Sequence, residues 1–212
     1  VGLEAGREFG LDMLQRLAAT IGERAKVFKA SGGVTDLPSY RATGATMPRI
    51  IAVIDEFQGL FERDDPLARE AAIAMETIIR KGRAFGVHLV LATQQISGGG
   101  LPRSIFTMVS CRVALMSSPS DSAQILGNDA NLEASELTRP GEGIINASPS
   151  GSRDDNRRFQ AINMAAQEVQ SVVATCRTLA AATGSARTPI VMDATRPASM
   201  TKTDGSALRN PV

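Results

Sequence analysis

The segment Pro48-Arg49-Ile50-Ile51-Ala52-Val53-Ile54-Asp55-Glu56-Phe57 decides how the rest of the chain is interpreted. From Ile50 to Ile54 every residue except Ala52 is a β-branched aliphatic, which favours an extended strand. A continuous apolar run of this length is typical of a strand buried on both faces, as in a parallel sheet. Asp55 and Glu56 would then lie at the carboxyl end of the strand, where open α/β sheets bind ligands.

An apolar strand that ends in Asp-Glu has the form of a Walker B element. In that element the aspartate holds Mg²⁺ through its coordination shell, and the glutamate polarises the water that attacks the γ-phosphate. The segment also fits a plain strand followed by a solvated turn, because short apolar runs followed by acids are common. Taken alone, it leaves both interpretations open.

The composition sets broad limits on the class of protein. With 212 residues, 43% hydrophobic and 21% charged, the chain is typical of one globular domain with a sizeable core. The formal net charge of +1 does not indicate strong nonspecific nucleic-acid binding, although a local basic stripe or a ring of subunits would still supply such a surface.

The sequence also bears on compartment and membranes. Cys111 and Cys176 do not form a metal-ligand spacing, and so few cysteines favour a reducing cytoplasm. No signal peptide opens the chain, and no apolar run approaches the roughly 20 residues that a membrane span needs. We therefore expect a cytoplasmic segment without membrane contact of its own, whether or not the parent protein is tethered to a membrane.

Helical and extended patterns alternate along the chain. Apolar residues recur at helical spacing over residues 9–30, and Asp65 is predicted to cap a helix that begins at Pro66 and ends near 80–83. Further elements are expected in this order: a second buried strand at 87–93, a short helix at 101–109, a third strand at 112–116, a helix capped by Ser120 and ended by Gly127, paired strands at 143–146 and 158–162, and a helix around 169–176. Strands that alternate with helices predict an α/β fold with a mostly parallel sheet.

Two segments lack such patterns. The loop Ser97-Gly98-Gly99-Gly100 fits either a plain connector or a DNA-facing pore loop, because glycine lets a backbone approach phosphates closely. Residues 183–212 are rich in Thr, Ser, Ala, Arg and Pro and are predicted to form a flexible polar tail after a domain at 1–182. Within the tail, 189–192 has the pattern of a short strand.

Side chains suited to phosphoryl transfer occur in four stretches that we predict to share one ligand edge. Such a reaction needs a carboxylate for the metal, another to place water, an amide near the γ-phosphate and a cation for transition-state charge. Arg80 and Lys81 also fit a simpler role, in which they complement the negative end of their helix. The stretches are Asp55-Glu56, Gln94, the basic cluster Arg80, Lys81 and Arg83, and Arg112 with Ser117, Ser118, Asp121 and Ser122.

Longer elements of the sequence resemble a known family. The segments Pro48–Phe57, Gly82–Gln94 and Arg112–Gly127, followed by the turn Gly141-Glu142-Gly143, are similar in order to elements of the FtsK/SpoIIIE motor domain. That family comprises hexameric ATPases of the additional-strand RecA-like class of P-loop NTPases. The resemblance covers about residues 10–175 and implies a mostly parallel sheet flanked by helices, incomplete on its N-terminal side.

The resemblance implies a role for each matching residue. Asp55 resembles the Walker B aspartate that coordinates Mg²⁺ through water, Glu56 the catalytic base, and Gln94 the sensor residue. These three would contact the nucleotide, and ATP and Mg²⁺ are the implied cofactors. Arg83 and Arg112 are both candidates for an arginine finger that acts on a neighbouring subunit, and the sequence does not rank them.

One departure from the family is large. The Walker A loop, Gly-x-x-x-x-Gly-Lys-Ser/Thr, is absent, because no Gly-Lys-Ser or Gly-Lys-Thr precedes Asp55. Without it, the backbone amides and lysine that cradle the β- and γ-phosphates are missing, so the segment alone is expected to be inactive. The retained Asp55, Glu56 and Gln94 favour a segment of a longer or two-part motor over a degenerate homologue.

The family resemblance implies an ATP-driven translocase of double-stranded DNA that works as a hexameric ring, of the kind used in chromosome segregation and cell division. Two alternatives remain open at this stage. Related motors of type VII secretion move polypeptides, and the modest net charge suits them equally well. A ring subunit that never hydrolyses ATP is the other alternative.

Overall fold

The computed structural model describes residues 3–94, 96 and 102–184. The expectations for the loop at 97–100, for the segment 189–192 and for the tail beyond residue 184 lie outside the described residues. The elements are α1 (Leu3–Ala30), α2 (Leu37–Ala42), β1 (Ile50–Ile54), the 3₁₀ turn η1 (Phe57–Phe61), α3 (Pro66–Phe85), β2 (Val87–Leu91), α4 (Arg103–Met108), β3 (Arg112–Leu115), α5 (Pro119–Leu126), the 3₁₀ turn η2 (Glu133–Glu136), β4 (Glu142–Asn146), the 3₁₀ turn η3 (Arg153–Asp155), β5 (Arg157–Gln160) and α6 (Ala166–Ala182).

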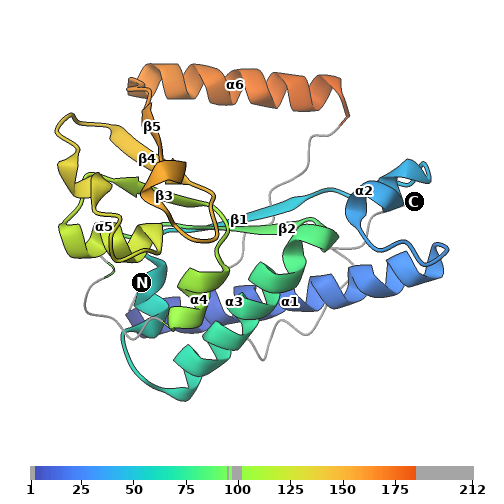
Figure 1. Cartoon of the computed structure of the whole chain (residues 1–212). Helices are drawn as coiled ribbons and strands as arrows, with labels where there is room; N and C mark the ends of the chain where they lie inside the picture. Colours follow the sequence, from blue (N-terminus) through green and yellow to red (C-terminus); the bar gives the residue numbers. More distant parts are fainter. Residues whose placement is uncertain (1–2, 95, 97–101, 185–212) are drawn as a thin grey trace.

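A parallel β–α–β unit forms the first half of the fold. β1 and β2 pair in parallel, in register from Ile50 opposite Val87 to Ile54 opposite Leu91, and α3 makes the crossover between them. Figure 1 shows α1 and α3 on one side of this pair. Their contact surface is the main core, in which Leu14, Ala71 and Met75 are completely buried. The predicted α/β fold with a parallel sheet is confirmed.

The prediction that β1 is buried on both faces is wrong. Side chains alternate along the strand, and Ile51 and Val53 point away from the helices with 65% and 66% of their surface exposed. Val90 on β2 is 48% exposed on the same sheet. Helices α1 and α3 pack on one face of this pair, and β-branched residues on both faces do not indicate which face is covered.

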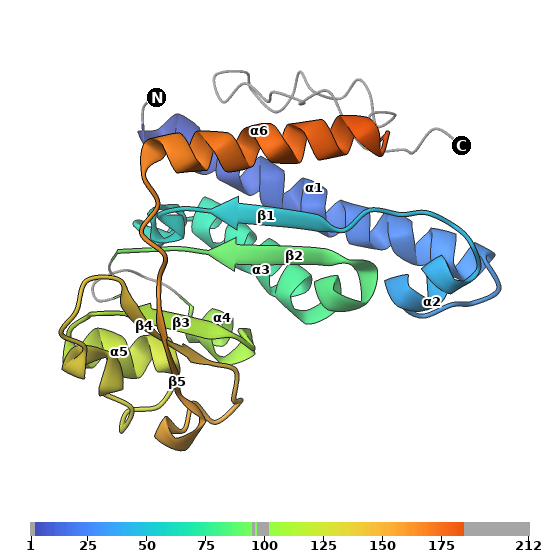
Figure 2. The same cartoon turned by 90° about the horizontal axis from the view of Figure 1, so that it is seen from above.

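The third strand belongs to a second sheet rather than extending the first. β3 pairs antiparallel with β4, which pairs antiparallel with β5, so the predicted hairpin at 143–146 and 158–162 is confirmed. Figure 2 shows these strands and α5 beside the parallel pair, beyond β2. Ala114, Leu126, Ala134 and Ile144 form a small core that is completely buried. Antiparallel pairing of β3 was not predicted, because a short apolar strand carries no signal for its direction.

Local capping fixes the ends of the helices. Asp65 caps α3 by accepting a hydrogen bond from the backbone of Ala68, as predicted. Gly86 ends α3 in the left-handed conformation at φ 67° and turns the chain directly into β2. For α5 the cap is Ser118 rather than the predicted Ser120, because Pro119 occupies the first helical position and places the cap just before it.

Helix α6 follows β5 and is present as predicted. It has no buried residue, and its apolar side chains Val169, Val172 and Leu179 are 47%, 51% and 60% exposed. Figure 1 shows α6 on the opposite side of the parallel pair from α1 and α3. Over the described ranges, no helix combines the length and apolarity needed to cross a bilayer.

Candidate nucleotide site at the carboxyl edge of the parallel sheet

The carboxyl ends of β1 and β2 place three of the predicted site residues together. The parallel pairing continues past both strands, because the amide of Ala92 donates to Ile54 at 2.9 Å and the amide of Phe57 donates to Ala92 at 3.2 Å. Between these bonds, Asp55 and Glu56 leave β1 while the chain leaves β2 toward Gln94. The backbone amide of Gln94 lies 3.5 Å from Oε2 of Glu56. The carboxyl ends of β1 and β2 therefore lie close together, as predicted.

Glu56 has an unusual backbone. Its φ of 51° lies in the left-handed region, and no other non-glycine residue in the described part of the chain has positive φ. This conformation costs a residue with a Cβ atom roughly 1–2 kcal/mol. The turn that follows is held by burial, since Phe57, Leu60 and Phe61 in η1 are all at most 5% exposed. Packing of η1 thus holds Glu56 in a conformation that it would not adopt alone.

The side chain of Gln58 contacts the Glu56 carboxylate. Its Nε2 atom donates to Oε2 of Glu56 at 2.5 Å, from two residues further along the chain. Gln58 is not among the residues predicted from the sequence, because a glutamine after an acidic pair carries no signal unless the chain turns back. The left-handed Glu56 produces that turn, and backbone conformation of this kind is not readable from residue types other than glycine and asparagine.

Asp55 has surroundings suited to an ion bound through water. Asp55 is exposed, and its Oδ1 atom accepts a hydrogen bond from the backbone amide of Glu56 at 3.1 Å. The described residues include no group of three or more His, Cys, Asp or Glu side chains placed to hold a metal ion by themselves. Mg²⁺ commonly binds through one or two carboxylates, water and substrate phosphates, and Asp55 with Glu56 fits that mode.

The basic cluster does not share this edge, which corrects the prediction for Arg80, Lys81 and Arg83. These residues occupy the last turns of α3, and a crossover helix runs opposite to the strands it connects. They therefore lie at the amino edge of the sheet, where Gly86 leads into β2. All three are exposed.

The prediction that Arg112 and its neighbours line the same edge is also not supported. Arg112 is only 7% exposed and donates hydrogen bonds to the carbonyls of Ser148, at 3.0 Å, and Phe106, at 3.2 Å. Burial lowers the pKa of this guanidinium. Ser118 caps α5, and Ser122 is completely buried. In this structure these side chains hold the second sheet together.

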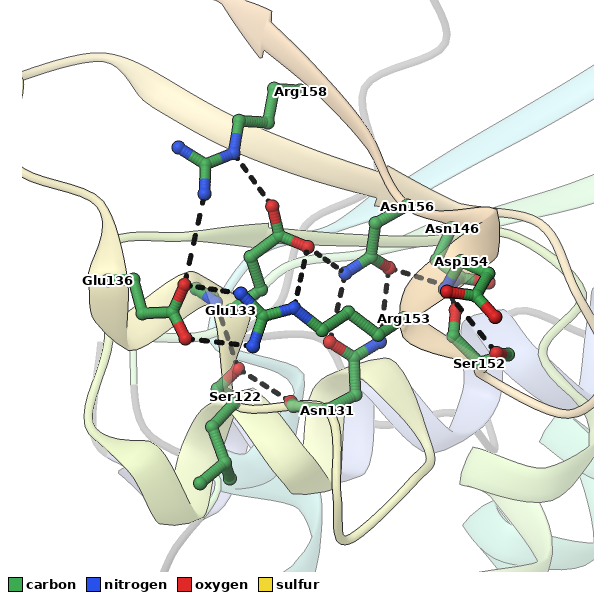
Figure 3. A network of polar contacts seen from close by, with 12 residues as sticks. Ser122, Asn131, Glu133, Glu136, Asn146, Ser152, Arg153, Asp154, Asn156 and Arg158 are labelled. Carbon is green, nitrogen blue, oxygen red and sulfur yellow. Dashed lines mark hydrogen bonds and ion pairs between the residues drawn. The ribbon is translucent and has the colours of Figure 1, made fainter.

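A polar network extends from Ser122 through the second sheet and fixes the loop between β4 and β5 (Figure 3). Asn156 is its centre, because Asn131 and Asn146 both donate to its Oδ1, at 3.0 and 2.7 Å. Its own amide donates to Glu133 at 2.7 Å. Burial alone would raise the pKa of Glu133, but hydrogen bonds from Asn156 and Arg158 and nearby positive charges lower it below the ordinary value. Ion pairs from Arg153 and Arg158 to Glu133 and Glu136 complete the network.

No protein-family model matches the chain, but several known proteins are similar to it in sequence. The ESX-4 secretion system protein EccC4 of Mycobacterium tuberculosis is 31% identical over 141 residues, which is 63% of this chain and 11% of that protein. The DNA translocase FtsK of the same species is 29% identical over 147 residues, which is 69% of this chain and 17% of that protein. The ESX secretion system protein YukB of Bacillus subtilis is 26% identical over 194 residues, or 89% of this chain and 12% of that protein.

Two solved structures resemble the fold. The cytoplasmic domain of the type VII secretion ATPase EccC from Thermomonospora curvata matches with a TM-score of 0.58 and 31% identity, over 71% of this chain and 17% of that chain. The pCW3 conjugation coupling protein TcpA, a monomer solved with ATPγS, matches with a TM-score of 0.64 and 20% identity, over 80% of this chain and 49% of that chain. At 20% identity, the similarity to TcpA supports the fold alone.

Together, the fold and the relatives define the class of protein. The fold is that of P-loop ATPase domains, with a small parallel sheet and flanking helices. The homologues of this chain include FtsK DNA translocases and ESX secretion ATPases, consistent with a motor domain of the FtsK/SpoIIIE type, so the resemblance seen in the sequence is confirmed. The chain spans between 11% and 17% of the length of the three curated relatives described above.

Proposed function

We propose that the chain is the carboxyl-terminal part of a ring-forming motor ATPase that moves double-stranded DNA. The observation that supports ATP hydrolysis is the grouping of Asp55, Glu56 and Gln94 at the carboxyl edge of β1 and β2, with the backbone amide of Gln94 3.5 Å from the Glu56 carboxylate. The FtsK relatives support DNA as the polymer that is moved. A P-loop ATPase places its metal ligand, its base and its sensor at this edge.

Each residue has a distinct role in the proposed reaction. Asp55 holds Mg²⁺ through water, Glu56 accepts the proton of the attacking water, and Gln94 reports whether the γ-phosphate is present. Bound ATP with Mg²⁺ supplies the phosphoryl group and the charge compensation that its transfer needs. The loop that cradles the phosphates is supplied from outside these 212 residues, because the sequence holds no Gly-Lys-Ser or Gly-Lys-Thr.

Arg83 is the proposed arginine finger. Its guanidinium is exposed at the amino edge of the sheet, opposite the carboxylates of its own chain. We propose a head-to-tail ring in which that edge of one subunit faces the nucleotide edge of the next, so that the cation reaches the phosphates of the neighbour. Arg112, whose guanidinium is engaged by two carbonyls of its own chain, is the weaker candidate.

A type VII secretion motor is the second candidate function. It is supported by the ESX relatives and by the EccC structure, since EccC4 and EccC each share 31% identity with this chain. The FtsK translocases share 29% to 31%, so identity does not separate the two functions. The two functions use the same nucleotide chemistry and differ in the polymer that is moved. A DNA motor grips the phosphate backbone, so its stimulation by DNA falls as salt rises. A polypeptide motor responds to its secreted substrate instead.

The deciding experiment measures ATP hydrolysis by the full parent protein with and without duplex DNA, beside a Glu56→Gln variant. Glu62→Gln is the matched control, because Glu62 is exposed and directly follows η1. We expect DNA-stimulated, salt-sensitive turnover that is lost in Glu56→Gln and kept in Glu62→Gln. Hydrolysis that ignores DNA supports the secretion motor. Binding of ATP without hydrolysis by the wild-type protein means a degenerate subunit and overturns the catalytic assignments.

A further inference from the structure

We infer that Gln58 is the positioning residue for the Glu56 carboxylate, an inference that rests on the proposed ATPase function. The residue lies in the turn η1, directly beyond the strand end that carries the site. Its amide reaches back to Glu56, and no other described side chain donates to that carboxylate. The role concerns the orientation of one oxygen and not a contact with the nucleotide itself.

The two hydrogen bonds to Glu56 are arranged asymmetrically. Both the Gln58 amide at 2.5 Å and the Gln94 backbone amide at 3.5 Å reach the same atom, Oε2. Within the described part of the chain, Oε1 is therefore left to accept other hydrogen bonds. A base that activates water needs one oxygen aimed at the water and must be kept from rotating. Anchoring of Oε2 provides that restraint.

The frame that carries Gln58 is rigid. Its neighbours in η1, Phe57, Leu60 and Phe61, are 5%, 5% and 2% exposed, and the amide of Gly59 closes the turn by donating to the carbonyl of Glu56 at 3.0 Å. The left-handed Glu56 is what brings the two side chains together. Backbone strain next to a fixed turn is the arrangement expected where a side chain must be pre-oriented.

The other atom of the Gln58 amide argues against a purely structural role. Oε1 of Gln58 is buried and, among the described residues, has no hydrogen-bond partner. An unpaired buried acceptor opposes folding, so an amide selected for stability alone would satisfy both of its ends. Reversing the amide would place its oxygen against the carboxylate. The observed orientation therefore keeps the hydrogen bond to Glu56 and leaves Oε1 of Gln58 without a partner among the described residues.

The test replaces Gln58 with methionine, which has a similar length and no donor. Gln15→Met is the matched control, because Gln15 also donates to a glutamate, Oε2 of Glu70 at 3.0 Å, on the far exposed surface between α1 and α3. In the full parent protein, we expect Gln58→Met to lower kcat for ATP by about 10-fold with KM unchanged, since only transition-state stabilisation is lost. Gln15→Met leaves both constants unchanged.

A double-variant cycle separates positioning from a general structural effect. If Gln58 acts through Glu56, then adding Gln58→Met to Glu56→Gln causes no further loss in single-turnover rate. Full additivity, a parallel rise in KM, or an unchanged kcat in Gln58→Met would each overturn the inference. Gln58→Glu serves as a second variant, and we expect it to lose more activity, because a carboxylate in that position repels Glu56.

The hydrogen bond between Gln58 and Glu56 can be detected without measuring ATP hydrolysis. The side-chain amide resonances of Gln58 should shift in the NMR spectrum when Glu56 is replaced by glutamine, and should stay in place in Glu62→Gln. A wild-type protein that hydrolyses no ATP would remove the proposed function and the positioning role together. A hydrolysing wild-type protein with an unaffected Gln58→Met variant would remove the positioning role alone.

Discussion

Arg7 in α1 and Asp65 at the start of α3 are joined by two parallel hydrogen bonds, 2.8 Å from Nη1 to Oδ2 and 2.9 Å from Nη2 to Oδ1. The same guanidinium donates to the carbonyl of Leu60 at 3.1 Å. Only 7% of the Arg7 side chain is exposed. One cation therefore ties α1 to the cap of α3 and to the turn η1 that carries Gln58.

Removing this cation should destabilise the fold. We expect Arg7→Met to lower the free energy of unfolding by about 1–3 kcal/mol, because the buried carbonyl of Leu60 and the half-buried carboxylate of Asp65 lose their donor. Arg69 and Asp64 form an exposed pair of the same length, 2.8 Å, with 61% and 90% of their side chains exposed. Arg69→Met should therefore cost less than about 0.5 kcal/mol. Urea denaturation compares the two variants, and equal losses would show that burial of Arg7 adds nothing.

The same pair predicts a sensitivity to acid. The hydrogen bond from Arg7 is the main cause that lowers the pKa of Asp65 from 3.8 to about 2, and the backbone amide of Ala68 adds to it. Because the folded pKa lies below the unfolded one, the charged carboxylate stabilises the fold fully above pH 3.8. That contribution is lost as the pH falls from 3.8 toward about 2.

An Asp65→Asn variant measures this acid-sensitive contribution. Asparagine keeps the helix cap but cannot titrate. Denaturation midpoints collected between pH 6 and pH 2 should fall less steeply in Asp65→Asn than in the wild-type protein. If the two profiles ran parallel through this window, the pair with Arg7 would not be formed in solution.

The sequence predicted the parallel unit because its signals are local. The continuous aliphatic run fixed β1, and the pair Asp65-Pro66 marked the start of α3 before any tertiary contact was known. Parallel pairing of β1 and β2 then brings Glu56 and Gln94 to one edge. These features follow from residue type and spacing alone, so that part of the candidate site was recoverable.

Other features depend on information that residue types do not carry. Ile50 and Ile51 are neighbouring isoleucines, yet one faces the helices and the other is 65% exposed. The placement of Arg83 on the opposite edge follows from the direction of the crossover helix and needs the topology first. Gln58 becomes visible only once the left-handed φ of Glu56 is known. Each missed feature is a matter of face, direction or backbone conformation.

Arg24 offers a second test of buried cations. It is 7% exposed and donates to the carbonyls of Phe85 at 2.6 Å and Pro48 at 2.8 Å, which joins α1 to the end of α3 and the entry of β1. Burial, followed by the charge of Arg41, lowers its pKa. We expect Arg24→Met to cost about 2–4 kcal/mol, since both carbonyls lose their donor.

Two comparisons sharpen the Arg24 prediction. Arg24→Lys should fall between wild type and Arg24→Met, because a single ammonium does not reproduce the planar fork that serves both carbonyls. Lys26→Met is the surface control, since Lys26 is exposed on the same helix and should change stability by less than about 0.5 kcal/mol. If Arg24→Lys matched wild type in thermal and urea denaturation, the fork geometry would be irrelevant.

Gly82 in α3 should resist a change that normally strengthens helices. Glycine to alanine inside a helix usually stabilises by about 1 kcal/mol. At Gly82, however, the added Cβ would lie 2.1 Å from the carbonyl oxygen of Val87, a backbone atom at the start of β2. Relief of that overlap requires α3 and β2 to separate, so we expect Gly82→Ala to destabilise the fold by about 2 kcal/mol.

Gly22 in α1 is the matched control. It has no atom within 4 Å of the same Cβ position, and Gly22→Ala should stabilise the fold by up to about 1 kcal/mol. Denaturation midpoints of the two variants should therefore move in opposite directions, and a shift of both to higher stability would show that α3 does not approach β2 this closely.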